Sequence, residues 1–94
     1  MNYEDNHIII TVSGTDKVGI VAGVSNCLAQ YKVNIEDIKQ TIMQGNFVMM
    51  MLCNIEKMEV SFKDFKQAML NLGDELKMEI WVQKKDIFDK MHTI

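Results

Sequence analysis

Few residues of this 94-residue chain could carry out chemistry. The two histidines, His7 and His92, have no carboxylate or cysteine at the spacing of a metal site, and no serine or cysteine turn presents a nucleophile to them. Cys27 and Cys53 lie in segments expected to form the core, which is typical of reduced thiols rather than of a disulfide framework or a zinc site. The sequence therefore predicts no catalytic residue, no metal site, no cofactor and a protein that is not an enzyme.

The loop Gly14–Ile20 carries the strongest sign of ligand binding. It connects a strand-like segment to a helical pattern, so its backbone N–H groups lie at a helix N-terminus, where a small carboxylate is stabilised. Gly19 would let a ligand approach the backbone closely. Asp16 either caps this helix or directs its carboxylate at a ligand ammonium group. Asn34 either satisfies the backbone of its own turn or contacts the ligand.

The elements that position this loop follow from the spacing of apolar residues. The expected elements are a strand over His7–Ser13, a helix over about Val18–Tyr31 with Thr15 or Asp16 as its N-cap, strands over Asn34–Met43 and Phe47–Cys53, a helix from a Ser61 N-cap to Leu76 with fraying near Gly73, a strand over Met78–Val82, and a short helical tail over about residues 84–92. The alternation within Asn34–Met43 is partial, with Ile38 and Ile42 expected on one face and Ile35 on the other.

The order of these elements has few compact solutions. Right-handed crossovers place both helices on one face of a four-stranded antiparallel sheet. We therefore expect an α+β, ferredoxin-like βαββαβ fold in which residues 1–94 form a single domain.

The other face of this sheet would lack a helical cover. Because the segment Phe47–Cys53 is apolar throughout, one of its two rows of side chains must point away from the helices. The two rows are Val48, Met50 and Leu52, and Met49, Met51 and Cys53. An exposed apolar row usually contacts another chain. The sequence therefore predicts a homodimer with Trp81 as a candidate contact, and it leaves open which row is exposed.

Composition narrows the range of partners. The net charge is -3 and all ten basic residues are Lys, so the chain lacks the Arg side chains that read guanine and clamp phosphate. Nucleic-acid binding is therefore not expected. The longest apolar run, Phe47–Cys53, is far shorter than the ~20 residues of a membrane-spanning helix. Residues 1–7 also lack the basic start of a secretory signal, so we expect a cytoplasmic protein with no membrane partner.

Two segments, TVSGTDKVGIVAGVS at Thr11–Ser25 and VNIEDI at Val33–Ile38, resemble the ACT domain. The signature of that family is a strand, an Asp/Asn-x-Pro-Gly turn, a helix and a strand that starts with Asn-Ile. The resemblance continues to the tail Ile87–Met91 and covers nearly the whole chain. The chain is most similar to the small stand-alone ACT-domain proteins, and more distantly to the glycine-cleavage-system repressor. The resemblance implies a βαββαβ fold, dimers, and amino-acid binding between chains at the first loop.

The resemblance also implies a set of site residues. In ligand-binding members, an Asn in the turn and an Asn at the strand start hold the amino acid from opposite subunits, and these positions align with Asp16 and Asn34. Val18 stands where the family has Pro, and an Asp at the turn position repels a carboxylate and attracts an ammonium group. The implied site comprises Gly14, Asp16, Lys17, Val18, Gly19 and Ile20 of one chain with Asn34 and Ile35 of the other.

The resulting hypothesis is a homodimeric regulatory sensor of an amino acid or similar small molecule. The sensor is expected to have no chemistry of its own and no attached output domain, so it would pass its state to an unidentified regulated protein. The alternative is a ligand-free protein-interaction module, in which the loop Gly14–Ile20 only starts a helix and the exposed sheet face binds a partner chain.

Overall fold

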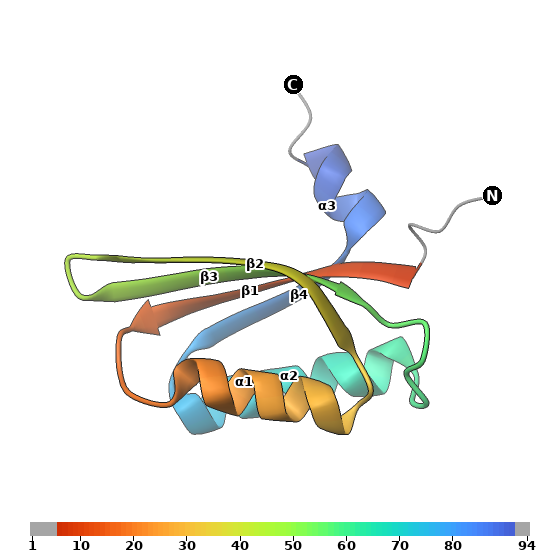
Figure 1. Cartoon of the computed structure of the whole chain (residues 1–94), viewed down its shortest axis with the longest axis horizontal. Helices are drawn as coiled ribbons and strands as arrows, with labels where there is room; N and C mark the ends of the chain where they lie inside the picture. Colours follow the sequence, from red (N-terminus) through yellow and green to blue (C-terminus); the bar gives the residue numbers. More distant parts are fainter. Residues whose placement is uncertain (1–5, 92–94) are drawn as a thin grey trace.

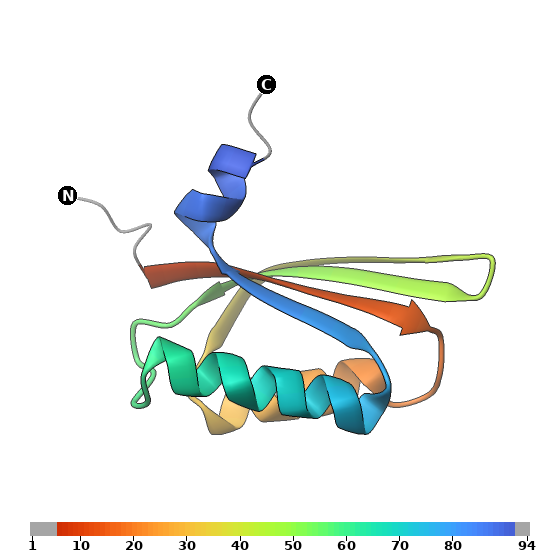
Figure 2. The same cartoon turned by 180° about the vertical axis from the view of Figure 1, so that it is seen from behind.

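A four-stranded antiparallel sheet organises the computed structural model, which describes residues 6–91 (Figure 1). The elements are β1 (His7–Thr15), α1 (Ile20–Gln30), β2 (Asn34–Met43), β3 (Asn46–Asn54), α2 (Phe62–Leu76), β4 (Glu79–Lys84) and α3 (Lys85–Met91). The strand order is β2-β3-β1-β4, and all three pairings are antiparallel. Helices α1 and α2 lie side by side on one face of the sheet in both views (Figures 1 and 2). The predicted α+β, ferredoxin-like arrangement is confirmed.

The core lies between the sheet and helices α1 and α2. On the central strand β1, the alternate residues Ile8, Ile10 and Val12 are completely buried. On β3, the row Phe47, Met49, Met51 and Cys53 is buried as well. Since neighbouring residues of a strand point to opposite faces, the row Val48, Met50 and Leu52 lies on the face away from the helices, here called the outer face. This settles the choice between rows that the sequence left open.

Strand β2 contains a β-bulge that changes which residues share a face. The register shifts between Ile35, which pairs with Cys53, and Asp37, which pairs with Leu52. Glu36 is therefore the extra residue of the bulge. Because Ile38 pairs with Met51, which shares the helix side with Cys53, Ile35 and Ile38 lie on the same face. The expectation that they lie on opposite faces is wrong, since simple alternation does not allow for an inserted residue.

Helix α1 begins later than its sequence pattern predicts. Its first residue is Ile20, and the N-cap is Gly19, whose backbone has a φ of 93°. Among residues 6–91, no side chain caps this end, so the predicted N-cap at Thr15 or Asp16 and the predicted start at Val18 are wrong. A left-handed N-cap is a conformation that glycine adopts without steric cost.

Helix α2 begins with the predicted cap and does not fray where expected. The Ser61 side chain accepts a hydrogen bond of 3.0 Å from the backbone N–H of Asp64. The helix then continues through the buried Gly73 to Leu76. A Cβ atom at Gly73 would lie only 2.8 Å from the carbonyl oxygen of Met78. A glycine is therefore required here because the chain segment that leads into β4 passes close to the helix. The expected fraying of α2 near Gly73 is wrong.

Helix α3, the last element of the described residues, lies on the outer face, opposite α1 and α2 (Figures 1 and 2). It follows β4 without a loop and contacts β1 and β4. Residues 92–94, including His92 and the end of the expected tail, lie outside the described residues, as do residues 1–5. Within residues 6–91, no helix has the length and apolar character needed to cross a membrane.

We predict opposite effects of the same substitution at two helical glycines. Gly73→Ala should lower the free energy of unfolding by about 1–3 kcal/mol, because the new methyl group meets a backbone carbonyl. Gly23→Ala should raise it by about 0.5–1 kcal/mol, since the Cβ would make ordinary 3.5 Å contacts with Leu76. Urea unfolding followed by circular dichroism measures both. Equal stability of the two variants would contradict the packing described for α2.

Candidate functional site

The loop from Gly14 to Ile20 lies at one end of the sheet, beside the β2–β3 hairpin turn. The backbone N–H of Asp16 donates a 2.9 Å hydrogen bond to the carbonyl oxygen of Gly45 in that turn. The Asp16 side chain is exposed, and Val18 is fully exposed. Because no side chain among the described residues caps α1, the loop presents a carboxylate and uncapped helix N–H groups to solvent.

Lys17 has a structural partner that the sequence did not reveal. Its Nζ donates a 2.6 Å hydrogen bond to the carbonyl oxygen of Leu76 at the end of α2. This bond satisfies one of the carbonyl groups left unpaired at a helix C-terminus, where a positive charge is also favourable. Lys17 therefore connects the loop to the end of α2.

Asn34 and Ile35 lie at the opposite end of the sheet from this loop. The register aligns Asn34 with Asn54 and His7 at one end, and Met43 with Asn46 and Thr15 at the other. Eight residue steps along β1 correspond to about 26 Å. Within one chain the structure brings Gly14 to Ile20 together, but it does not bring Asn34 or Ile35 to them.

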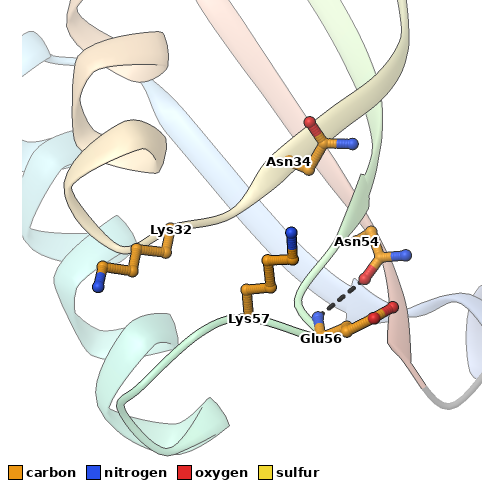
Figure 3. Close-up of a pocket in the computed structure, with 5 residues that line it drawn as sticks. All are labelled: Lys32, Asn34, Asn54, Glu56 and Lys57. Atoms are coloured by element: carbon orange, nitrogen blue, oxygen red, sulfur yellow. Dashed lines mark hydrogen bonds between the residues drawn. The ribbon is translucent and has the colours of Figure 1, made fainter.

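Asn34 lines a surface pocket of about 330 Å³ (Figure 3). The lining residues are Lys32, Asn34, Asn54, Glu56 and Lys57, from the ends of β2 and β3, the α1–β2 turn and the β3–α2 loop. Figure 3 shows Lys57 extended toward the two asparagines, whereas Lys32 points the other way. Lys32 forms an ion pair of 3.1 Å with Glu59. The pocket thus offers an ammonium group and an amide group from different elements.

A hydrogen-bonded cluster at the bulge holds Asn54 in place. Its Oδ1 accepts a 2.8 Å hydrogen bond from the backbone N–H of Glu56, and its Nδ2 donates a 3.2 Å bond to Glu36 Oε2. The other oxygen of Glu36 lies 2.9 Å from Nε2 of the buried His7. The bulge therefore directs the Glu36 side chain toward His7 on β1 and Asn54 on β3. The contact with Asn54 orients a side chain that lines the pocket.

Asn54 and Lys57 line this pocket but are not among the site residues that the sequence predicts. Both lie at or beyond the end of β3, where neither periodicity nor a motif marks them. The register of β2 against β3 reveals Asn54, because it puts this residue directly opposite Asn34. Lys57 is revealed only by the position of its side chain in the pocket.

Neither thiol is suited to nucleophilic chemistry. Burial, and to a smaller extent the negative charge of Glu36, raises the pKa of the Cys53 thiol to about 12. Burial, followed by the charge of Glu75, raises the pKa of Cys27. Since the thiolate is the reactive form, both cysteines are held in the unreactive state near neutral pH.

The groups near the two ends of β2 can bind a charged molecule through amide, ammonium and carboxylate contacts.

Fold and site together define a small α+β domain with candidate binding groups near the two ends of its edge strand β2. The sequence pattern of the ACT domain matches residues 6–83, and the chain belongs to the ACT domain family. A UPF0237 protein of Listeria innocua is 46% identical over 86 residues, which cover 92% of this chain and 97% of the relative. These relatives are small stand-alone ACT-domain proteins, and the family is a regulatory one rather than an enzyme family.

Solved structures agree with this assignment. An ACT domain protein from Streptococcus pneumoniae has a TM-score of 0.78 and 37% identity, with 88% of this chain and 93% of that chain covered. A structure assigned as a glycine cleavage system transcriptional repressor has a TM-score of 0.70 and 24% identity, and the match covers 82% of this chain and 44% of that one. The second likeness shows the fold alone. ACT domains are regulatory and often bind amino acids.

We predict that Lys17 contributes to stability through the end of α2. Lys17→Met should lower the free energy of unfolding by a few tenths to about 1 kcal/mol, because a cap and a favourable charge are lost. Lys63→Met, an exposed lysine in the first turn of α2, should leave stability unchanged or slightly higher. Urea unfolding measures both. If Lys17→Met unfolds at the same urea concentration as the unaltered protein, the contact has no stabilising role.

Proposed function

We propose that this protein is a cytoplasmic regulatory sensor that binds an amino acid, or a similar small zwitterion, between two copies of the chain. The observation that supports this most directly is the separation of Asp16 and Asn34 to opposite ends of β2. A site that uses both residues requires a second copy. Membership of the ACT domain family supports the regulatory role.

The edge of β2 offers a way to complete the site. Because β2 is the outermost strand on its side of the sheet, one side of its backbone has no partner strand among the described residues. The strand is ten residues long. Unpaired strand edges readily pair with another chain. Antiparallel pairing of two β2 edges would bring the Asn34 end of one copy to the Met43 end of the other. The loop with Asp16 lies at that Met43 end, since it is bonded to Gly45.

Particular charged groups of the two half-sites suit the two ends of an amino acid. The pocket at Asn34 contains the carboxylate of Glu56 as well as the ammonium group of Lys57, and Figure 3 shows that the Glu56 side chain points away from Lys57. Asp16 attracts an ammonium group, and Lys57 with Asn34 provides a cation and an amide donor for a carboxylate. A zwitterion between the two copies would thus have its ammonium group toward Asp16 and its carboxylate toward Lys57. Binding would favour the arrangement of the two copies in which both contacts form.

A protein-interaction module is the second candidate. The row Val48, Met50 and Leu52 and the side chain of Trp81 lie on the outer face, and Trp81 is 58% exposed. This surface could contact the regulated protein in the sensor, or be the whole function if no ligand binds.

We predict that one of the common amino acids, at ~10 mM, raises the thermal unfolding midpoint. A ligand with a dissociation constant of ~100 μM would add ~2.7 kcal/mol of stability, a rise of roughly 10 °C or more in a domain of this size. Asp16→Ala and Asn34→Ala should each remove the response. Glu79→Ala, which removes an exposed carboxylate from the opposite edge strand, should retain it. If no amino acid raises the midpoint, the interaction module becomes the better account.

A second prediction concerns the direction of the bound molecule. Lys57→Gln should weaken binding of that amino acid about tenfold or more, because a charged partner of the carboxylate is lost. It should not weaken binding of the matching amine that lacks the carboxylate. Lys63→Gln is the matched control. Calorimetric titration measures the affinities, and sedimentation shows whether each variant keeps the dimer. Equal losses for both ligands would mean that Lys57 does not face the carboxylate.

A further inference from the structure

A second pocket lies on the outer face, beneath α3 and away from Asn34. Its volume is about 480 Å³. The lining residues are Thr11, Met50, Trp81, Gln83, Phe88 and Met91. Figures 1 and 2 show that α3 rises from the sheet on the side opposite α1 and α2. The sensor site proposed above uses none of these residues.

Three strands form the floor of this pocket. Thr11 on β1 pairs with Trp81 on β4 and with Met50 on β3, so the three side chains lie in a line across the sheet. All three belong to the outer face, because the core rows alternate with them. An indole ring and a thioether therefore flank a hydroxyl group.

The wall of the pocket is α3, which contributes Phe88 and Met91. Nε2 of Gln83 donates a hydrogen bond of 3.4 Å to Sδ of Met91, and this contact links the end of α3 to β4. An ion pair of 2.5 Å between Lys85 and Asp89 spans one turn of the helix. The ion pair stabilises the helix itself, whereas the wall is attached to the sheet by its direct continuation from β4 and by the contact between Gln83 and Met91.

The lining is apolar and carries no charge. Trp81 and Met91 remain 58% and 65% exposed, and Met50 is 37% exposed, so large apolar side chains converge on an open space. The polar groups are the neutral Thr11 hydroxyl and Gln83 amide. An ion placed there would lose hydration without gaining a charged partner, whereas a neutral apolar molecule would gain burial. The volume lies within the range of small-molecule sites.

We propose that this pocket binds a small neutral molecule with an aromatic or branched aliphatic body and one hydroxyl or carbonyl group. The body lies against Trp81 and Met50 beneath Phe88, and the polar group faces Thr11 or Gln83. A flat second sheet is a poorer occupant, because α3 stands on this face and would have to move before a sheet could cover Trp81 (Figure 1). This site is separate from the sensor site, because it shares no residue with it and its lining carries no charge.

The test uses Trp81, the single tryptophan of the chain, as an intrinsic fluorescent reporter. The probe is benzyl alcohol, with benzoate and benzylammonium as charged analogues of similar shape. We expect a saturable change in emission with benzyl alcohol, half complete at a concentration on the order of 1 mM. The two charged analogues should bind at least about tenfold more weakly. A linear, unsaturated response, or equal binding of the charged analogues, would overturn the proposal.

Two variants and one control locate the binding. Met50→Lys puts a cation in the floor and should abolish the saturable response, while Val48→Lys, on the same face of β3 but outside the pocket, should retain it. Phe88→Ala weakens the wall and should raise the half-saturation concentration severalfold. Phe88 lies on a helix with no buried residue, so Phe88→Ala is expected to fold. This variant therefore tests the proposal even if Met50→Lys does not fold. If sedimentation instead shows self-association lost in Met50→Lys, and benzyl alcohol does not bind the unaltered protein, the face is an interface between copies and the proposal is wrong.

Discussion

The antiparallel pairing of β1 with β3 is the constraint on which the rest of the structure depends. These two central strands bury Ile8, Ile10 and Val12 beside the row that begins with Phe47, all against α1 and α2. Since side chains alternate along a strand, this burial forces Val48 and Met50 to the outer face. The apolar character of both faces follows from that one pairing, and so does the surface on which α3 lies.

The same pairing divides the candidate binding groups into two sets. β1 and β3 run the full length of the sheet, so Asp16 lies at one end and Asn34 at the other. The bulge at Glu36 has a second effect. It directs the Glu36 carboxylate toward Asn54, and this contact orients the Asn54 side chain in the pocket at the Asn34 end. A single chain therefore presents Asp16 at one end and Asn34 with Lys57 at the other, which is the separation that the proposed site between two copies requires. The uncharged pocket under α3 differs from them in chemistry and in position.

Particular residues show where prediction from the sequence works and where it stops. The strands, the Ser61 cap and the ferredoxin-like order were predictable, because alternation and capping are local properties. The start of α1 was not, since Gly19 takes a left-handed conformation that leaves Asp16 outside the helix. Gly73 suggests fraying when only helix propensity is considered, whereas its role depends on the Met78 carbonyl brought close by β4. Lys17 bonds to a residue far along the chain, so no local pattern indicates its partner.

The sequence by itself determined the order of elements, the ACT domain resemblance and the candidate residues of the loop and the strand start. Each of these depends on residues that are near one another in the chain. Only the tertiary structure decided that Met50 faces outward, that Asn34 lies opposite Asn54, and that Lys57 completes its pocket. The reason is physical: strand register and helix docking are fixed by contacts between distant segments, and a one-residue bulge is enough to move a side chain from one face to the other.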